Sequence, residues 1–475
     1  MPFINRLLER ARVTPDSDAV VTEEGKLTCA ELVARASALP LPDGNLVALE
    51  LADPLAFTVA FTAVVGRGKC AAVLDPAWPE ELRTRVLDGL RPVGVLDELL
   101  FSGAVPEAAE ADGRPGALAD AAAETRFYCG FTSGTSGVPK AFVRSSGSWA
   151  RSLRRSAAYF GVTPGLRTFA PGPLSSSLNL YALAEALYAG AAFFTLGAST
   201  QGPRGVRMAE ALASWRIQHL VAVPAAVGLA LQRVDSLPAL RTVVAGGARL
   251  TDLQVSKVLR VAPNAWIFEY YGASELSLVT ARRVHGAVGG AVGGDVGKPF
   301  PGVRLRIEAD QPMSPGTIWV STDTAIDGYL LGDDGHGFTR DGEWVTVHDQ
   351  GWIDDDGGLH LAGRAGDMLV VAGTNVYPSE VEDALARIGF RSAVAFGIPD
   401  GRRGTLLAAA IEAESHEEVD SHRIRQALRE TLPAVKIPSR VKAVDSIPLT
   451  AAGKPDRAAL AVLMQDSEAT RAHIS

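Results

Sequence analysis

The sequence predicts an α/β protein whose large N-terminal domain contains mixed and parallel sheets flanked by helices. Residues 46–75 hold a β-rich run, a helix-like run and a second β-rich run, the order of a βαβ unit in a parallel sheet. From about residue 297, short alternating runs separated by Pro/Gly turns predict a small β-barrel-like subdomain of antiparallel strands over 297–365. A new helix and strand pattern then begins, so we expect a large domain over 1–365 and a small α+β domain over 368–475.

The N-terminus predicts an amphipathic surface helix. Apolar side chains recur at i, i+3, i+4 and i+7 over residues 4–11, with arginines between them, whereas a signal peptide would have an unbroken apolar region. Buried strands are expected at 191–196, 219–223 and 242–245, separated by helical segments such as 207–215.

Two helices are expected in the C-terminal domain, over residues 379–388 and 421–432. Ser379 followed by Glu382 is the pattern of a capping box, so we expect these two residues to cap the first helix.

The composition of the 475-residue chain is that of a globular protein with a sizeable core. Apolar residues make up 47% and charged residues 21%, and the net charge of −8 argues against a nucleic-acid partner. No apolar run reaches the ~18 residues of a membrane-spanning helix, so no membrane partner is expected. Cys29, Cys70 and Cys129 lie far apart, which favours buried thiols in a reducing compartment. We therefore expect a cytoplasmic protein.

The most informative segment is Phe-Thr-Ser-Gly-Thr-Ser-Gly-Val-Pro-Lys at residues 131–140. Gly134 and Gly137 let backbone N–H groups approach a ligand closely, and Lys140 adds a positive charge, which suits a polyphosphate. Hydroxyl donors come from Thr132, Ser133, Thr135 and Ser136. The segment lacks the G-x-x-x-x-G-K-[ST] pattern of the common P-loop. A flexible Ser/Gly-rich linker has a similar composition, and the segment alone does not separate the two interpretations.

Two segments have residues suited to a nucleotide. The first is residues 270–275, with the sequence Tyr-Tyr-Gly-Ala-Ser-Glu. Its aromatic rings could stack on a purine, and its hydroxyl and carboxylate could contact a phosphate and its Mg²⁺. Residues 244–248, Val-Ala-Gly-Gly-Ala, end an apolar strand with glycines against which a planar ligand could lie. Each segment by itself is equally consistent with an ordinary strand end or turn.

Two further segments are consistent with substrate contacts. Asp349, in His-Asp-Gln-Gly at 348–351, has a carboxylate that can accept hydrogen bonds from a sugar diol. Lys454 lies on a glycine-containing loop at 450–457. A turn aspartate and a solvated lysine are the ordinary alternatives.

In this order, the segments resemble the adenylate-forming superfamily of acyl-CoA synthetases, adenylation domains of nonribosomal peptide synthetases, and luciferase. The resemblance covers nearly the whole chain, and the loop at 132–140 together with the lysine motif is quite specific. Other matching segments are Leu27–Leu32, Gly68–Pro76, Tyr271–Glu275, Gly297–Gly302, Gly328–Tyr329, Asp349, Gly363–Asp367 and Gly373–Glu380.

The resemblance implies ATP and Mg²⁺ as cofactors and gives the matching residues their roles. The loop at 132–140 would hold the β- and γ-phosphates, and Lys454 would bridge the substrate carboxylate and the α-phosphate. Ser274 would contact the α-phosphate and Glu275 would bind Mg²⁺, which makes these two and Lys454 the catalytic residues. Tyr271 would stack on adenine, and Gly246, Gly247 and Ala248 would line the same slot. Tyr270 and Gly272 would also bind the nucleotide, and Asp349 and Arg364 would bind the ribose.

A second half-reaction follows in most members of the superfamily. The resemblance implies that the C-terminal domain is mobile and rotates about a hinge at Asp367. The rotation would replace the Lys454 loop with the segment that contains Gly373 and Thr374, which opens a path for a thiol. Coenzyme A is the favoured acceptor.

The acid pocket is expected beside residues 171–179. Its predicted lining is Leu174, Ser175, Ser177, Asn179, Gly246 and Gly272. Amino-acid-activating relatives carry an aspartate in this region, but no acidic residue lies between Ala170 and Tyr181 here. Because a buried ammonium without a counter-ion is costly, an α-amino acid is not expected, and a fatty, aryl or arylacrylic acid fits.

Three alternatives stay open. The enzyme could load a carrier-protein thiol instead of coenzyme A, or activate an unusual oxyacid such as nitrite for diazotisation of an aryl amine. A catalytically silent nucleotide-binding protein is the alternative of another class.

Overall fold

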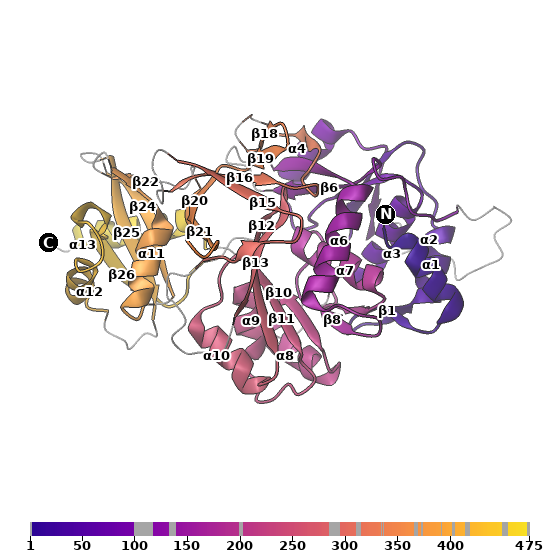
Figure 1. Ribbon diagram of the computed structural model, residues 1–475, viewed down its shortest axis with the longest axis horizontal. Coiled ribbons are helices and arrows are strands. Elements are labelled where there is room, and N and C mark those ends of the chain that lie inside the picture. Colours follow the sequence, from indigo (N-terminus) through magenta and orange to yellow (C-terminus); the bar gives the residue numbers. More distant parts are fainter. Residues whose placement is uncertain are drawn as a thin grey trace. The chain divides into compact units, whose positions relative to one another are not determined.

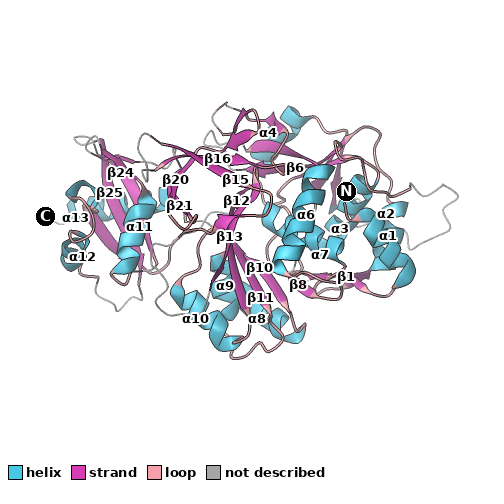
Figure 2. Ribbon diagram, viewed as in Figure 1, coloured by secondary structure: helices cyan, strands magenta, loops and turns pink. Residues whose placement is uncertain are grey.

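The computed structural model describes residues 2–98, 117–132, 139–198, 203–284, 295–309, 315–333, 335, 337–364, 369–371, 374–390, 392–400, 404–413, 419–448 and 455–472. The chain forms two compact units. The first comprises Met1–Val284, Pro299–Arg304 and Val320–Val347, and the second comprises His285–Lys298, Leu305–Trp319 and His348–Ser475. Each unit contains both helices and strands, which confirms the predicted α/β class (Figures 1 and 2).

The first unit contains a nine-stranded sheet with the order β14-β13-β12-β11-β10-β8-β9-β1-β2. Its strands are β1 (Asp18–Val21), β2 (Lys26–Thr28), β8 (Arg167–Phe169), β9 (Ala192–Phe194), β10 (His219–Ala222), β11 (Thr242–Gly246), β12 (Trp266–Ala273), β13 (Ser277–Val284) and β14 (Lys298–Pro299). Strands β9, β10 and β11 confirm the three predicted buried strands. Neighbouring strands from β1 to β12 are parallel, and β13 runs antiparallel to β12.

One face of this sheet is covered by α8 (Arg204–Ser214), α9 (Pro224–Leu231) and α10 (Asp252–Val261). Met208 and Leu212 of α8 share one apolar core with Leu220, Val243 and Ile267 of the strands. Burial of this apolar surface fixes the sheet register, because a shift by one residue would turn these side chains to the opposite face.

A six-stranded sheet with the order β17-β7-β6-β4-β3-β5 also belongs to the first unit. Its strands are β3 (Leu46–Glu50), β4 (Cys70–Val73), β5 (Gly94–Asp97), β6 (Arg126–Thr132), β7 (Lys140–Ser145) and β17 (Gly328–Leu331). Strands β3 and β4 are parallel and joined by α3 (Pro54–Gly66), so the predicted βαβ unit is confirmed. Strands β6 and β7 form an antiparallel pair that ends at the partners Thr132 and Lys140.

Helices α6 (Ser146–Phe160) and α7 (Ser177–Ala189) lie side by side in the first unit (Figure 1). Ser145 caps the start of α6 by accepting a hydrogen bond from the Ser148 N–H, and Gly161 ends the helix with a φ of 73°. Other helices described in this unit are α1 (Ile4–Val13), α2 (Cys29–Ala38) and α4 (Glu80–Leu90). Helix α1 confirms the predicted N-terminal helix, whose Ile4 and Leu7 are buried.

The second unit contains a three-stranded sheet of β24 (Ala393–Asp400), β25 (Gly404–Glu412) and β26 (Arg440–Val444). Its two faces have separate apolar cores, one with α11 (Pro378–Arg387) and α12 (Ser421–Leu428), the other with α13 (Arg457–Ala472). Helices α11 and α12 confirm the two helices predicted here. The predicted capping box is wrong, however: Glu380 accepts the Tyr377 N–H, whereas the Glu382 carboxylate accepts the Ala395 N–H and binds Arg457.

The predicted antiparallel subdomain forms short strands but no closed barrel among the residues described. These strands are β15 (Arg304–Glu308), β16 (Gly316–Ser321), β18 (Thr339–Asp341), β19 (Trp344–Thr346), β20 (Asp349–Ile353) and β21 (Leu359–Arg364). In the first unit the end of β16 pairs with β19, and in the second unit its start pairs with β20. Strand β17 lies in the same stretch of sequence but pairs with β7.

Two other expectations can be compared with the coordinates. Cys29, Cys70 and Cys129 are all buried free thiols, as predicted. Across the described ranges, no helix combines the length and the apolar character that crossing a bilayer requires.

Candidate active site

Two hydroxyl groups from separate strands meet at the Glu275 carboxylate, which follows β12. Glu275 is buried, with 6% of its surface exposed. The Thr132 hydroxyl at the end of β6 donates to its Oε1 at 3.3 Å, and the Tyr329 hydroxyl of β17 donates to the same oxygen at 2.9 Å. The pairing of β17 with β7 is what brings Tyr329 to this position.

Lys140, the predicted phosphate-binding lysine, lies at the same end of the β6–β7 pair. It is the cross-strand partner of Thr132 and is buried. Its Nζ lies 5.8 Å from the centroid of the Tyr329 ring, within the range of a cation–π contact. The structure thus brings Thr132, Lys140 and Glu275 together. Ser133, Gly134, Thr135, Ser136 and Gly137 lie outside the described residues, so their roles stay predictions.

Arg144, four residues further along β7, holds the backbone next to Glu275. Its guanidinium donates to the Ser274 carbonyl at 2.5 Å and also to the Thr324 carbonyl. Burial lowers the pKa of Arg144 to about 10, and the negative charge of Glu275 partly counteracts this shift. The side chain therefore ties the strand that follows the phosphate loop to the segment that carries the candidate Mg²⁺ ligand.

Replacing Arg144 by methionine is expected to lower the free energy of unfolding by about 1–3 kcal/mol for each buried carbonyl that loses its donor. Arg144→Lys should cost less, because one amine can still serve one carbonyl. Urea denaturation checks both variants, with Arg12→Met on the exposed face of α1 as the control, expected within about 0.5 kcal/mol of the wild type. An Arg144→Met variant as stable as this control would contradict a structural role for the two hydrogen bonds.

The residues predicted to surround adenine lie on or just after β11 and β12, which are side by side. Gly246 is the cross-strand partner of Tyr270, and a Cβ at Gly246 would lie 2.3 Å from the Tyr270 ring. Glycine is required there because the ring occupies the space of a side chain. A bulge separates Tyr271 from Gly272, so the two residues do not follow regular strand alternation. Gly247 and Ala248 follow β11 and are exposed.

Four of the six predicted acid-pocket residues lie in the first turn of α7 or just before it, and the other two, Gly246 and Gly272, lie on β11 and β12. The Ser274 hydroxyl lies 3.3 Å from the Ser177 hydroxyl, which is in turn 3.2 Å from the Tyr128 hydroxyl. Leu174 is buried, and Ser175 has a buried hydroxyl without a partner among the described residues. Asn179 accepts the Gly172 N–H and is therefore engaged in holding the preceding loop.

In the second unit, the two predicted ribose-binding residues are cross-strand partners: Asp349 of β20 lies opposite Arg364 of β21. Asp349 is buried. Thr374 begins strand β23 (Thr374–Val376), which pairs with β22 (Leu369–Val371). Asp367, Gly373 and Lys454 lie outside the described residues, so the hinge, the thiol path and the catalytic lysine stay predictions.

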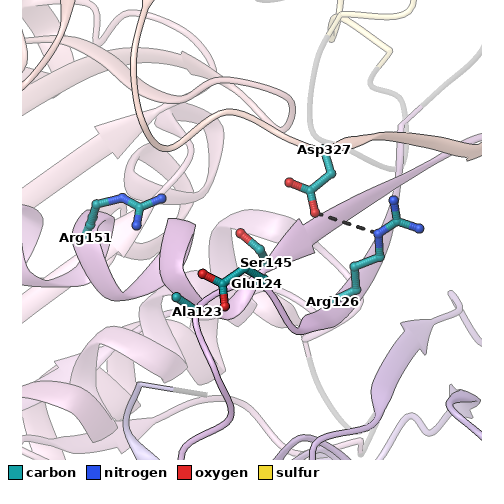
Figure 3. A pocket seen from close by; sticks show the side chains of 6 residues that line it. All are labelled: Ala123, Glu124, Arg126, Ser145, Arg151 and Asp327. Carbon is teal, nitrogen blue, oxygen red and sulfur yellow. Dashed lines mark ion pairs between the residues drawn. The ribbon is translucent and has the colours of Figure 1, made fainter.

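A separate cavity of about 350 Å³ lies at the opposite end of the β6–β7 pair (Figure 3). It is lined by Ala123, Glu124, Arg126, Ser145, Arg151 and Asp327. Arg126 begins the seven-residue β6 that Thr132 ends, which separates the cavity from Glu275 by roughly 20 Å at 3.3 Å per residue. Arg126 lies 3.8 Å from Asp327 in an ion pair, so this cavity is distinct from the candidate nucleotide site.

Sequence reasoning missed Arg144 and Tyr329 as residues that contact the candidate site, and it did not single out the buried Glu185 of α7. Arg144 is the one charge between the apolar residues at 141–143 and the serines that follow, and Glu185 is the one charge in α7. A lone charge within an apolar element is the signal that could have identified both. Tyr329 belonged to a matching segment, but only its pairing with β7 reveals its contact with Glu275.

Comparison with known proteins identifies the family. A family model described as AMP-binding enzyme matches residues 7–330, and a second, described as AMP-binding enzyme C-terminal domain, matches residues 380–454. The chain belongs to the AMP-binding enzyme family. This confirms the resemblance to adenylate-forming enzymes, and the protein is an ATP-dependent, AMP-forming ligase.

This AMP-binding enzyme is 30% identical over 456 residues to YhfT of Bacillus subtilis (strain 168), named an uncharacterised acyl-CoA ligase, with 89% of each chain covered. Among solved structures, ATP-bound MatB from Rhodopseudomonas palustris has a TM-score of 0.83 at 22% identity, covering 98% of this chain and 99% of MatB. The o-succinylbenzoate CoA synthetase MenE from Bacillus subtilis, in complex with the acyl-adenylate OSB-AMP, has a TM-score of 0.79 at 22% identity, covering 96% and 98%. At these identities the two structural similarities show a shared fold.

Proposed function

We propose that this AMP-binding enzyme converts a carboxylic acid and ATP into an acyl adenylate and pyrophosphate, and then transfers the acyl group to coenzyme A. The observation that carries the proposal is the meeting of Thr132, Lys140 and Tyr329 around the buried Glu275 carboxylate. This arrangement combines a cation for phosphate oxygens with a carboxylate suited to a metal ion, at the end of the predicted phosphate loop.

Glu275 fits a Mg²⁺ ligand. Its hydrogen bonds from Thr132 and Tyr329 both end on Oε1, and carboxylate oxygens are the ligands that Mg²⁺ prefers. When bound, the ion supplies positive charge to the phosphate oxygens. Tyr329, Thr132 and, through the Ser274 carbonyl, Arg144 hold Glu275 in place for that purpose.

The chain's own cations address the main difficulty of the first half-reaction, in which a carboxylate attacks a negatively charged phosphate. Lys140 would hold the leaving phosphates, and Lys454 would contact both the carboxylate and the α-phosphate. Positive groups placed where negative charge collects in the transition state are usually the largest contribution to catalysis. Ser274 would position the α-phosphate through its hydroxyl.

Coenzyme A as the acceptor is supported by relatives. YhfT is named an acyl-CoA ligase, and MenE is titled a CoA synthetase in complex with an acyl adenylate. A carboxylate oxygen of the acid would first attack the α-phosphate of ATP and release pyrophosphate. The thiol of coenzyme A would then attack the acyl carbon of the adenylate and release AMP.

Replacing Asp367 by proline is expected to spare adenylate formation and to block thioester formation. Proline fixes its own φ near −65° and restricts the preceding residue, so a hinge at this position could no longer change its φ between the two half-reactions. Adenylate formation is measured by ATP–pyrophosphate exchange, and thioester formation by mass spectrometry of acyl-CoA. Equal loss of both steps in a variant that melts like the wild type would refute the hinge.

The proposed function is tested by ATP–pyrophosphate exchange with fatty, aryl and arylacrylic acids, followed by product mass with and without coenzyme A. Exchange that depends on a carboxylic acid, and an acyl-CoA product, are expected. If exchange occurs but only a carrier-protein thiol is acylated, the acceptor is a carrier protein and not coenzyme A. Turnover with nitrite and an aryl amine, without exchange for any carboxylic acid, would overturn the assignment.

A further inference from the structure

Three polar residues recur every fourth position along α7, a helix whose other buried residues are mostly apolar. They are Ser177, Tyr181 and Glu185, which we call the α7 polar line. Residues at i, i+4 and i+8 lie along one face of a helix, so these side chains follow one another. At 1.5 Å per residue, the two ends of the line are about 12 Å apart along the helix axis.

The first end of the α7 polar line lies at the predicted reaction centre, because the Ser177 hydroxyl is 3.3 Å from that of Ser274. The middle of the line faces serines of α6. The Tyr181 hydroxyl lies 2.7 Å from the Ser152 hydroxyl and 2.9 Å from the Ser156 hydroxyl. The hydrogen bonds therefore give Tyr181 partners within the protein.

The far end of the line is Glu185, whose situation is different. The residue is 3% exposed, and its Oε1 has no hydrogen-bond partner among the residues that the structure describes. Burial raises the pKa of Glu185 to about 7, and the Ser156 hydroxyl partly counteracts the shift. A buried carboxylate oxygen without a donor is costly, and a ligand that supplies the donor would remove that cost.

Tyr270 connects Glu185 with the β11–β12 side of the site. The Tyr270 ring packs against Gly246. Burial raises the pKa of the Tyr270 phenol, and the negative charge of Glu185 raises it further. Tyr181 and Tyr270 are deep enough for burial to raise both phenol pKa values, yet neither side chain is fully buried. The two tyrosines that interact with the charge of Glu185 therefore keep some exposed surface.

We propose that Glu185 binds an amino group at the far end of the substrate, so that the enzyme activates amino-substituted carboxylic acids whose amine is remote from the carboxyl group. The inference rests on the proposed acid activation and adds the substrate class. An amine donates hydrogen bonds to the carboxylate and, when protonated, also neutralises it, which makes it the strongest partner for this acceptor. The length of the α7 polar line excludes an α-amino group as the one that reaches Glu185.

The test compares acids that differ only by an amino or a methyl group at the far end: 4-aminocinnamate with 4-methylcinnamate, and 6-aminohexanoate with heptanoate. In ATP–pyrophosphate exchange, the wild type should favour the amino acid of at least one pair by ~10-fold or more in kcat/KM, since a site built around a hydrogen bond rejects the analogue that lacks it. Glu185→Gln keeps the size of the side chain and should reduce this ratio by ~10-fold. The main change should be a higher KM for the amino-substituted acid. Glu210→Gln, on the exposed face of α8, is the matched control and should leave the ratio unchanged.

The outcomes separate the two proposals. A Glu185→Gln variant that keeps the wild-type ratio, or a wild type that prefers the methyl-substituted acid of both pairs, overturns the role of Glu185 and leaves acid activation intact. Exchange with none of these acids, nor with any other carboxylic acid, overturns the proposed function itself. Exchange with the methyl acids also reports whether Glu185→Gln has folded, because their rate should stay within about threefold of the wild type.

Discussion

Replacing Glu275 by glutamine is expected to lower the rate of ATP–pyrophosphate exchange by about 10²–10³-fold, comparable to the loss of one group that stabilises transition-state charge. The amide keeps an oxygen that can accept from Tyr329 and Thr132, so the local hydrogen bonds can persist. The amide lacks the negative charge that makes a carboxylate a good Mg²⁺ ligand, so the concentration of Mg²⁺ at half-maximal rate should rise as well.

The measurement is exchange with the best acid over a range of Mg²⁺ concentrations, together with a thermal melt. Glu9→Gln, on the exposed face of α1, removes the same charge far from the cluster and should leave the rate unchanged. A Glu275→Gln enzyme with nearly the wild-type rate at low Mg²⁺ would show that the metal ligand is elsewhere, and that Glu275 mainly joins β12 to β17.

Replacing Lys454 by alanine is expected to have an effect of similar size, about 10²–10³-fold, but on the first half-reaction alone. Its ammonium would neutralise the attacking carboxylate and the α-phosphate only while the adenylate forms. Once the C-terminal domain has rotated, this lysine would be away from the site, so a synthetic acyl adenylate should still react with coenzyme A.

Single-turnover adenylation and the reaction of pre-formed adenylate with coenzyme A measure the two steps separately. Lys257→Ala, a lysine on α10, is the control for loss of a positive charge. The prediction pairs with that for Asp367→Pro, which should show the opposite pattern. If both variants lost both steps equally, the enzyme would not divide its half-reactions between two domain arrangements.

Much of the architecture could be predicted because its signals are local. The βαβ unit at 46–75 depends on the order of apolar runs, and the strands at 219–222 and 242–246 depend on short β-rich stretches. The capping box was wrong for an equally local reason. Ser379 and Glu382 have the right spacing, but the chain enters the helix two residues earlier, where Glu380 accepts the Tyr377 N–H.

The candidate site was only partly predictable. Thr132, Lys140 and Glu275 follow from motifs in which residue type and spacing reflect phosphate and metal chemistry. The absence of an acidic residue between Ala170 and Tyr181 argued against an α-amino acid, but the pattern did not indicate the buried carboxylate further along the same helix. Whether a glutamate on a helix is buried depends on the elements that pack against it. Glu185 is buried, and that burial raises its pKa to about 7.

By itself, the sequence determined that this protein is an adenylate-forming enzyme, and it predicted a phosphate loop that ends at Lys140 and a metal-binding carboxylate at Glu275. Only the tertiary structure decided how that carboxylate is held, since Arg144, Thr132 and Tyr329 reach it or its backbone from positions 54 to 143 residues away. It also decided that Glu185 is buried, with one oxygen that has no hydrogen-bond donor among the described residues. The physical reason is that hydrogen bonding and desolvation depend on neighbours in space, and strand pairing brings together residues that no local pattern relates.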